Sequence, residues 1–254
     1  MNKKAITSVH MSYLLINKLT LCYIYVIIYN MIVKTFVEPP IDNNNYVLID
    51  EITGFAALVD CSSPDIWDKV PRTKGTVSAS IAGENREEFQ NVTLKYILLT
   101  HGHFDHIGGL RPDILSEPNT EKIPVLMHKN DTDLVKEVNN YMPMMGMPKI
   151  TVPQIDKFVE DNEIIQLGNT TIKVIHTPGH TQGGVCYYAD NKLFSGDTIF
   201  RESVGRCDLP GGDFDQIVKS IKEKIFTLPN ETIIYPGHGK PTEVLWEKEH
   251  NPYF

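Results

Sequence analysis

From Met31 onward, short apolar runs alternate with turn signals, a pattern typical of a β-rich domain. We interpret six runs as strands: "IVKTFV", "YVLID", "GFAALVD", "LKYILLT", "IPVLMH" and "TIIYPG", the last of which leads into a closing loop "HG". Residues 163–177 predict a hairpin that turns at Gly168 and Asn169. Residues 184–198 predict a second hairpin across Asp190 and Asn191.

Helix signals lie between these strands. Ser62 or Ser63 is a suitable N-cap for a short helix that begins at Pro64, and Asp213 is a suitable N-cap for a helix that ends near residue 225. A third helix is expected over residues 131–142. Residues 79–87 are ambiguous, with a length that suits the helix of a strand–helix–strand crossover.

Composition narrows the class of protein. A chain of 254 residues with 41% hydrophobic and 22% charged residues has ample material for one packed domain. The formal charge of −8 argues against nucleic acid or an anionic membrane surface as partners. The four cysteines show no CxxC spacing, so reduced thiols are expected rather than a disulfide framework or a zinc knuckle.

Residues 1–30 differ from the rest of the chain. The apolar stretch from Leu19 to Val33 resembles a signal-peptide core or a short membrane anchor, but it falls short of the ~20 residues that span a bilayer. Residues 1–30 are therefore read as a targeting-like extension, or as untranslated sequence if Met31 is the start. A start at Met31 would imply a cytoplasmic protein. Use of the extension would imply a mitochondrial, plastid or secretory destination, and membrane contact only if it acts as an anchor.

The segment "THGHFDHIGG" concentrates His101, His103, Asp105 and His106 directly after a predicted strand. One interpretation is a polar turn that is rich in histidine. The other is a metal site, because three more candidates follow predicted strands in the same way, each with glycine or proline beside it: His180, Asp197 and His238. Loops at strand ends are the usual source of catalytic ligands. For His10, His128 and His250 a surface position is expected, and His176 is expected in a core or surface position.

Imidazole and carboxylate groups favour zinc, iron or manganese over calcium. Seven such groups are enough for two ions, with Asp197 able to bridge them through its two oxygens. Two ions at ~3.5–4 Å lower the pKa of a shared water molecule towards neutrality. Zinc is the first expectation, with iron and manganese as alternatives.

Four motifs occur in a fixed order: "HGHFDH", "TPGHTQGG", "LFSGDTIF" and "YPGHG". In this respect the chain resembles the metallo-β-lactamase superfamily and, within it, the short bacterial-like type of the glyoxalase II (hydroxyacylglutathione hydrolase) group. The resemblance implies an α/β fold, a single-domain four-layer αββα sandwich over residues 31–254. It implies that His101, His103 and His180 bind one metal, that Asp105, His106 and His238 bind the second, and that Asp197 bridges them.

The activity that the resemblance implies is hydrolysis of a glutathione thioester of the S-lactoylglutathione kind. A hydroxide that bridges the metals attacks the carbonyl carbon, and the thiolate leaves. Asp105 and Asp197 are the ligands expected to act in catalysis. Arg206 is expected to contact the anionic end of the substrate, with an ion pair to Asp208 or Asp213 as the alternative.

Two features separate this chain from related groups. Only sixteen residues follow His238, so the C-terminal helical extension of longer glyoxalase II enzymes is expected to be missing. Lactamases usually lack the second residue of the "DH" pair, so His106 argues against that activity.

Two other activities share the motifs. An iron-dependent persulfide dioxygenase would use a single iron on His101, His180 and Asp197. A nuclease of the same fold ranks third, because the chain has no basic tract.

Overall fold

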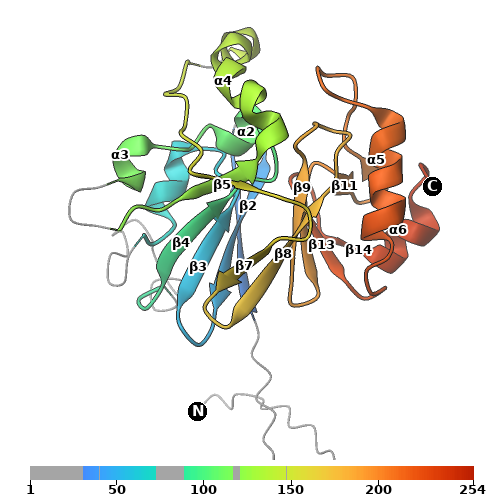
Figure 1. Ribbon diagram of the computed structural model, residues 1–254, viewed down its shortest axis with the longest axis horizontal. Coiled ribbons are helices and arrows are strands. Elements are labelled where there is room, and N and C mark those ends of the chain that lie inside the picture. Colours follow the sequence, from blue (N-terminus) through green and yellow to red (C-terminus); the bar gives the residue numbers. More distant parts are fainter. Residues whose placement is uncertain (1–30, 40, 73–88, 117–120, 147) are drawn as a thin grey trace, which may run out of the picture.

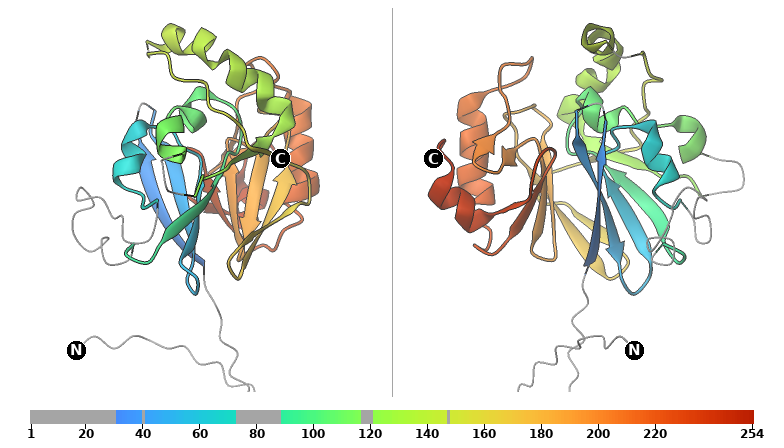
Figure 2. Two further views of the ribbon diagram at one scale, coloured as in Figure 1. Left: turned by 60° about the vertical axis from the view of Figure 1, so that its left-hand side comes forward. Right: turned by 180° about the vertical axis from the view of Figure 1, so that it is seen from behind.

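Two six-stranded β-sheets lie face to face, and helices cover their outer faces (Figure 1). The computed structural model describes residues 31–39, 41–72, 89–116, 121–146 and 148–254. The predicted helix at 79–87 and the extension at 1–30 lie outside these residues. Seen from two further directions, the layers keep the order helix, sheet, sheet, helix (Figure 2). The expected four-layer αββα sandwich is therefore confirmed.

The first sheet has the strand order β1-β2-β3-β4-β5-β6. Its strands are β1 (Met31–Glu38), β2 (Asn43–Asp50), β3 (Phe55–Val59), β4 (Thr93–Leu98), β5 (Val125–His128) and β6 (Lys157–Val159). The first three strands are antiparallel, and β3 to β6 run parallel to one another. Parallel strands end at the same edge, so the loops that follow β4 and β5 are neighbours.

The second sheet has the order β14-β13-β10-β9-β8-β7. Its strands are β7 (Ile164–Leu167), β8 (Thr170–His176), β9 (Val185–Ala189), β10 (Lys192–Gly196), β13 (Ile233–Pro236) and β14 (Thr242–Glu243). β10 and β13 are parallel, and the other neighbours are antiparallel. A small hairpin of β11 (Ile199–Phe200) and β12 (Ser203–Val204) follows β10.

The helical elements lie outside the two sheets and along one edge of the sandwich. The first group is η1 (Pro64–Asp68), α2 (Phe104–Ile107), α3 (Pro112–Leu115), η2 (Lys129–Asp131), α4 (Thr132–Tyr141) and η3 (Met142–Met145). The second group is α5 (Phe214–Ser220), the π-helical turn η4 (Ile221–Ile225) and α6 (Val244–His250). In Figure 1 α5 and α6 cover the outer face of the second sheet, and α4 rises above the strand ends.

Three apolar clusters hold the layers together, and alternation along each strand assigns its residues to them. In β2, Val47 packs towards the helices while Leu48 packs between the sheets. In β4, Ile97 and Leu98 divide in the same way. A third cluster around Ile217 fixes α5 and η4 on the second sheet. A strand that is covered on both faces reads as a continuous apolar run, which explains "YVLI" and "YILL".

Both predicted hairpins are present. Gly168, with φ of 61°, lies in the turn between β7 and β8, where a Cβ would lie 2.2 Å from Thr53 Oγ1. Asp190 and Asn191, with φ of 47° and 57°, form the turn between β9 and β10. Positive φ at both central positions suits the right-handed twist of the flanking strands.

The helix caps are also as predicted. Ser63 Oγ accepts a hydrogen bond from Asp65 N, although η1 is a 3₁₀ helix. Asp213 accepts one from Gln216 N at 2.9 Å.

The end of the chain was predicted wrongly as a strand and a loop. Strand β14 and helix α6 follow the "YPGHG" segment and pack on the second sheet. The signal was weak because β14 has only two residues, and the apolar positions of α6 are few. Val244 is the residue of α6 that enters the third apolar cluster.

The described cysteines, Cys61, Cys186 and Cys207, are all free thiols, as expected. Cys22 lies outside the described residues. In the described part of the chain, no helix combines the length and apolar character that crossing a membrane requires.

Candidate metal centre

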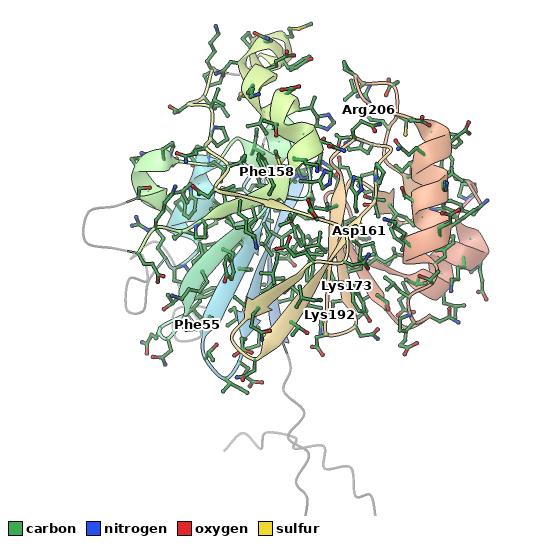
Figure 3. The ribbon with its side chains drawn as sticks, viewed as in Figure 1. Phe55, Phe158, Asp161, Lys173, Lys192 and Arg206 are labelled. Atoms are coloured by element: carbon green, nitrogen blue, oxygen red, sulfur yellow. The ribbon has the colours of Figure 1, made fainter. Side chains whose placement is uncertain are left out.

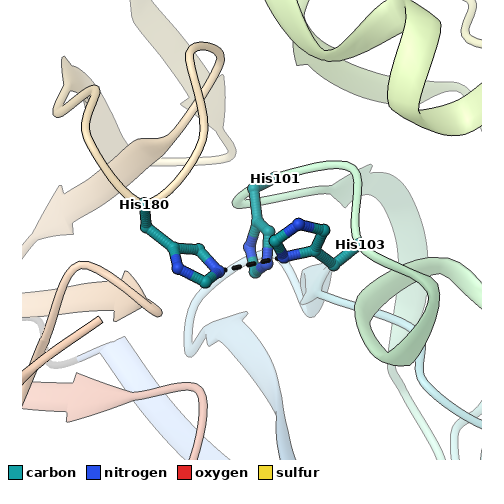
Figure 4. A group of neighbouring side chains, drawn as sticks. All are labelled: His101, His103 and His180. Carbon is teal, nitrogen blue, oxygen red and sulfur yellow. Dashed lines mark hydrogen bonds between the residues drawn. The ribbon is translucent and has the colours of Figure 1, made fainter. Parts of the chain in front are cut away.

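Four strand ends meet at one edge of the sandwich, and each carries residues of the sequence motifs. His101 follows β4 of the first sheet. His180 follows β8 of the second sheet, and Asp197 and His238 follow β10 and β13. The motifs are far apart in sequence, and only the packing of one sheet on the other brings them together. The histidines from the two sheets face each other across this edge (Figure 4).

His101, His103 and His180 form the first cluster. One donor atom from each lies within 4.8 Å of the others, and His103 Nδ1 is 2.9 Å from His180 Nε2. Burial, together with the neighbouring imidazoles, lowers the pKa of His101 well below its usual value and that of His103 to about 4. These imidazoles are therefore neutral at pH 7, which is the form that binds a metal ion.

Asp105, His106, Asp197 and His238 form the second cluster, again with donor atoms within 4.8 Å. His238 Nε2 is 3.1 Å from Asp105 Oδ2, and His106 Nε2 is 3.4 Å from the same oxygen. Burial alone would raise the pKa of Asp105, but the nearby His106 outweighs it, so that the pKa lies well below the usual value. The carboxylate is therefore ionised at neutral pH.

Asp197 lies between the two clusters. Its Oδ1 is 3.4 Å from His106 Nε2, and its Oδ2 is 3.6 Å from His180 Nε2 and 3.7 Å from His238 Nε2. All seven predicted ligands are thus brought together, with Asp197 placed as a bridging residue would be. Their role as ligands stays a prediction.

Unpaired buried atoms show that the site suits a cation. His101 Nε2 and Asp197 Oδ1 are buried without a hydrogen-bond partner among the described residues. A buried polar atom without a partner costs about 1–3 kcal/mol, and such atoms are rare in folded proteins. Both atoms are aimed into the clusters, and a divalent ion would satisfy them. The histidine and carboxylate clusters are therefore consistent with a binuclear metal site.

The outer nitrogens of the histidines are held by fixed partners. Asp60 Oδ2 is 2.8 Å from His106 Nδ1, and the Arg206 carbonyl oxygen is 2.7 Å from His180 Nδ1. These acceptors require a proton on Nδ1, so Nε2 is the nitrogen that faces the clusters. There His106 Nε2 lies 2.9 Å from Asn43 Nδ2, and His180 Nε2 lies 2.9 Å from His103 Nδ1. Asp60 was not among the predicted site residues, although it lies directly after β3 as the ligands lie after their own strands.

Asp131 ties together the loops that carry His101 and His180. Its Oδ2 accepts hydrogen bonds from Gly102 N at 2.9 Å and Thr181 Oγ1 at 2.7 Å, and its Oδ1 accepts one from Gly183 N at 2.6 Å. The Asp131 side chain is fully buried, and that burial raises its pKa. The sequence analysis treated Asp131 only as the start of a helix, because nothing local distinguishes it from other capping aspartates.

The asparagine run at residues 43–45 also has a role at this edge. Asn44 N donates to the Gly237 carbonyl oxygen at 2.7 Å, and Asn44 Nδ2 donates to Pro236 O at 3.0 Å and Gly239 O at 2.9 Å. These bonds hold the backbone on both sides of His238. An asparagine run that reads as low complexity is therefore a buried structural element.

Close packing explains why glycine precedes two of the ligands. A Cβ on Gly237 would lie 2.2 Å from Asp197 Oδ1, and Gly196 has a φ of 49°. At these two positions glycine therefore lets the backbone turn sharply and approach the site.

Arg206 lies on the loop between β12 and α5, near the outer end of the site (Figure 3). Its guanidinium forms a two-fold ion pair with Asp208, with N···O distances of 2.7 and 2.8 Å, and the Arg206 side chain is 61% exposed. The expected alternative, an ion pair with Asp208, is therefore present. Burial raises the pKa of the adjacent Cys207 thiol, so this cysteine is not activated as a nucleophile.

The remaining described histidines, His128, His176 and His250, lie outside the two clusters, and His10 lies outside the described residues. His128 was expected at the surface, and this is wrong: it is buried and stacks on His176 with ring centroids 4.1 Å apart. It lies at the end of β5, where the ring of His176 at the end of β8 covers it. His250 is exposed and stacks on Trp246, as expected of a surface residue.

Comparison with known proteins places the chain in a family. The family model for the metallo-beta-lactamase superfamily matches residues 39–238, so the chain belongs to that superfamily.

The relatives of this chain include proteins that are named as hydrolases. The chain is 37% identical over 162 residues to "Probable metallo-hydrolase YqgX" of Bacillus subtilis, which covers 62% of this chain and 74% of the relative. It is 32% identical over 173 residues to "Hydroxyacylglutathione hydrolase GloC" of Haemophilus influenzae, covering 66% and 79%.

Solved structures share the whole sandwich. The crystal structure of BLEG-1 B3 metallo-beta-lactamase has a TM-score of 0.71 and 32% identity, covering 87% of this chain and 99% of that one. TTHA1623 in a di-iron-bound form has a TM-score of 0.70 and 28% identity, covering 87% and 100%. The superfamily, its fold and the two clusters together define a metal-dependent hydrolase as the class of this protein.

Proposed function

We propose that this protein hydrolyses thioesters, of the S-lactoylglutathione kind, with two divalent metal ions. The observation that carries the proposal is the complete set of seven ligand side chains in two adjoining clusters. The similarity to a hydroxyacylglutathione hydrolase supports the choice of thioester. Hydrolysis forms a C–O bond with the oxygen of water and breaks the C–S bond, and a proton from the water passes to the thiolate, giving an acid and a thiol.

The metal ions, when bound, supply a Lewis acid and lower the pKa of water. The chain's own residues supply position and charge. His101, His103 and His180 would hold one ion, and Asp105, His106 and His238 the other, with Asp197 shared. Asp105 and Asp197 have lowered pKa values, since nearby histidines outweigh the effect of burial, so both carboxylates are ionised throughout the neutral range, which is the form that would bind the ions.

We propose zinc as the first candidate for the metal, with iron or manganese next. Histidine and carboxylate ligands accept all three ions, and TTHA1623 is described in a di-iron-bound form. For the thiol arm we propose glutathione, with Arg206 facing one of its carboxylates. Arg206 would then give up part of its ion pair with Asp208 and pair with a carboxylate of the substrate instead.

Two other activities need the same fold. A one-iron persulfide dioxygenase would require only His101, His180 and Asp197, and the presence of the second cluster is compatible with both activities. The similarity to a hydroxyacylglutathione hydrolase is what favours hydrolysis. β-Lactam hydrolysis is a second candidate, because the chain is 32% identical to a B3 metallo-beta-lactamase. This likeness weakens the argument that the presence of His106 in the "DH" pair counts against lactamase activity. The charge of −8 favours a small-molecule substrate over nucleic acid.

The test combines metal content with turnover on one preparation of the full chain. Zinc, iron and manganese are counted per chain, and the protein is offered S-lactoylglutathione, a β-lactam and glutathione persulfide with oxygen uptake recorded. We expect about two metals per chain, thiol release without oxygen uptake, and loss of activity after chelation that added zinc restores. One iron per chain, with oxygen uptake on the persulfide alone, would overturn the proposal.

His238→Ala separates the two leading activities, with His250→Ala as the control. His238 belongs to the second cluster, whereas His250 is exposed on α6. A hydrolase that needs both ions should lose most of its rate in His238→Ala and keep it in His250→Ala. A one-iron dioxygenase should retain much of its rate in both variants.

A further inference from the structure

A cavity of about 860 Å³ opens directly above the metal centre. Its floor consists of residues from both clusters: His103, Asp105, His180, Asp197 and His238. Any substrate whose carbonyl carbon reaches the clusters must therefore place its remaining atoms against the walls of this cavity. The chemistry of the walls determines which substrates fit.

One wall is the inner face of helix α4. Leu134, Val138 and Tyr141 lie at positions i, i+4 and i+7, so they project from one side of the helix. Phe104 and Met144 extend this wall at either end. The face turned to the cavity is thus apolar apart from the Tyr141 hydroxyl.

The opposite wall comes from the β11–β12 hairpin and the loop that follows it, and it is also apolar. It consists of Phe200, Val204, Leu209 and Pro210, with Ile41 contributed by the segment between β1 and β2. Both walls belong to loops and helices that the two sheets fix in place, so the apolar space is already formed. Apolar cavities with a few polar groups at one end are the usual form of sites for apolar small molecules.

The walls offer little to a charged ligand. Among the described residues that line the cavity, Arg206 is the one with a permanent positive charge, and it is paired with Asp208 and 61% exposed. Glutathione carries two carboxylates and one ammonium group. The anionic arm therefore belongs on the Arg206 side, at the rim, which leaves the α4 wall for the acyl arm.

We propose that the α4 side of this cavity is an acyl pocket, and that the enzyme prefers thioesters with an apolar linear or aromatic acyl group over the small hydroxyacyl group of S-lactoylglutathione. The inference rests on the proposed thioester hydrolysis and specifies its substrate class. Each methylene group that enters the pocket is removed from water, and this burial should raise kcat/KM about fourfold for each methylene added to the acyl chain. The lactoyl group, with one methyl and one hydroxyl, would leave most of the pocket unused.

The turnover test uses S-acetyl-, S-butanoyl-, S-hexanoyl- and S-octanoylglutathione with the metal-loaded full chain. We expect kcat/KM to rise steeply along the series, by at least tenfold overall. In Leu134→Asn, which places an amide on the α4 wall, the ratio of the octanoyl to the acetyl value should fall at least fivefold. Leu245→Asn is the matched control, because Leu245 lies on α6 and is 40% exposed, and this ratio should stay unchanged.

A binding test keeps this inference separate from the proposed activity. S-Methyl- and S-hexylglutathione are thioethers that no hydrolase cleaves, and calorimetry gives their Kd values. We expect S-hexylglutathione to bind at least tenfold more tightly, and this gain to shrink in Leu134→Asn. Thioester hydrolysis without any chain-length preference would overturn the acyl pocket alone. Absence of thioester hydrolysis, with S-hexylglutathione still bound more tightly, would overturn the proposed function alone. Equal Kd values for the two thioethers would overturn the pocket whether or not thioesters are cleaved.

Discussion

Asp131→Ala tests whether one buried carboxylate holds the two halves of the metal centre together. Its donors lie in two loops: Gly102 in the loop after β4, and Thr181 and Gly183 in the loop after β8. The first loop belongs to one sheet and the second to the other. Removing the carboxylate should therefore destabilise the protein and also misplace His101 relative to His180.

The magnitude follows from the number of bonds and the burial. A hydrogen bond to a charged group contributes about 1.5–3 kcal/mol, so three such bonds to Asp131 contribute at least about 4.5 kcal/mol. Burial raises the pKa of Asp131, which means that the ionised carboxylate carries a desolvation cost that the substitution would relieve. We expect a net fall in the free energy of unfolding of about 3 kcal/mol and metal binding that is weaker by about 10–100-fold.

Two assays separate these effects. Urea unfolding of the metal-free chain gives the change in stability, and competition with a chromophoric chelator gives the zinc affinity. Asp131→Asn keeps the shape of the side chain and serves if the alanine variant does not fold. Asp133→Ala is the control on the same helix, since that side chain is 88% exposed and pairs only with Lys136 at the surface. A loss below about 1 kcal/mol in Asp131→Ala, with unchanged zinc affinity, would refute the reasoning.

Two further predictions concern residues that hold or neighbour the centre. Asp60→Asn should weaken zinc binding by about 10–100-fold, measured by the same competition, because the amide offers one acceptor oxygen where Thr100 N and the Nδ1 proton of His106 each need one. Unchanged affinity would mean that other contacts orient the His106 ring. Burial and the neighbouring His176 lower the pKa of His128 to about 4 from 6.5, so the unfolded chain binds a proton there that the folded chain does not. The stability that depends on neutral His128 is complete above pH 6.5 and is lost as the pH falls towards 4, by about 2 kcal/mol between pH 7 and pH 5. Between pH 7 and pH 5, the free energy of unfolding measured in urea should fall by about 2 kcal/mol less in the His128→Asn variant than in the native chain. Equal falls in the two proteins would show that His128 titrates normally.

The sequence by itself determined most of the strands, the turns of both predicted hairpins and the candidate ligands, whereas β6 and the β11–β12 hairpin were not predicted. These signals are local, since a continuous apolar run, a turn with two residues of positive φ and a helix cap depend on neighbouring residues only. The segment "THGHFDHIGG" was equally clear, because three histidines and one aspartate within six positions are conspicuous without any knowledge of the fold. Weak local signals were missed, as β14 and α6 show.

Only the tertiary structure decided which groups support the ligands and what surrounds them. Asp60 and Asp131 are ordinary aspartates in the sequence, and their roles arise from hydrogen bonds to residues about 30 to 50 positions away. The burial of His128 likewise depends on a ring from another sheet.

The acyl pocket has the same origin. Leu134 and Val138 read as the apolar face of an amphipathic helix, a pattern that does not distinguish a core contact from a cavity wall. Local patterns fix which residues can act, because they depend on the chain's own periodicity. The packing of the two sheets decides where those residues meet, since it sets distances between segments that share no sequence signal.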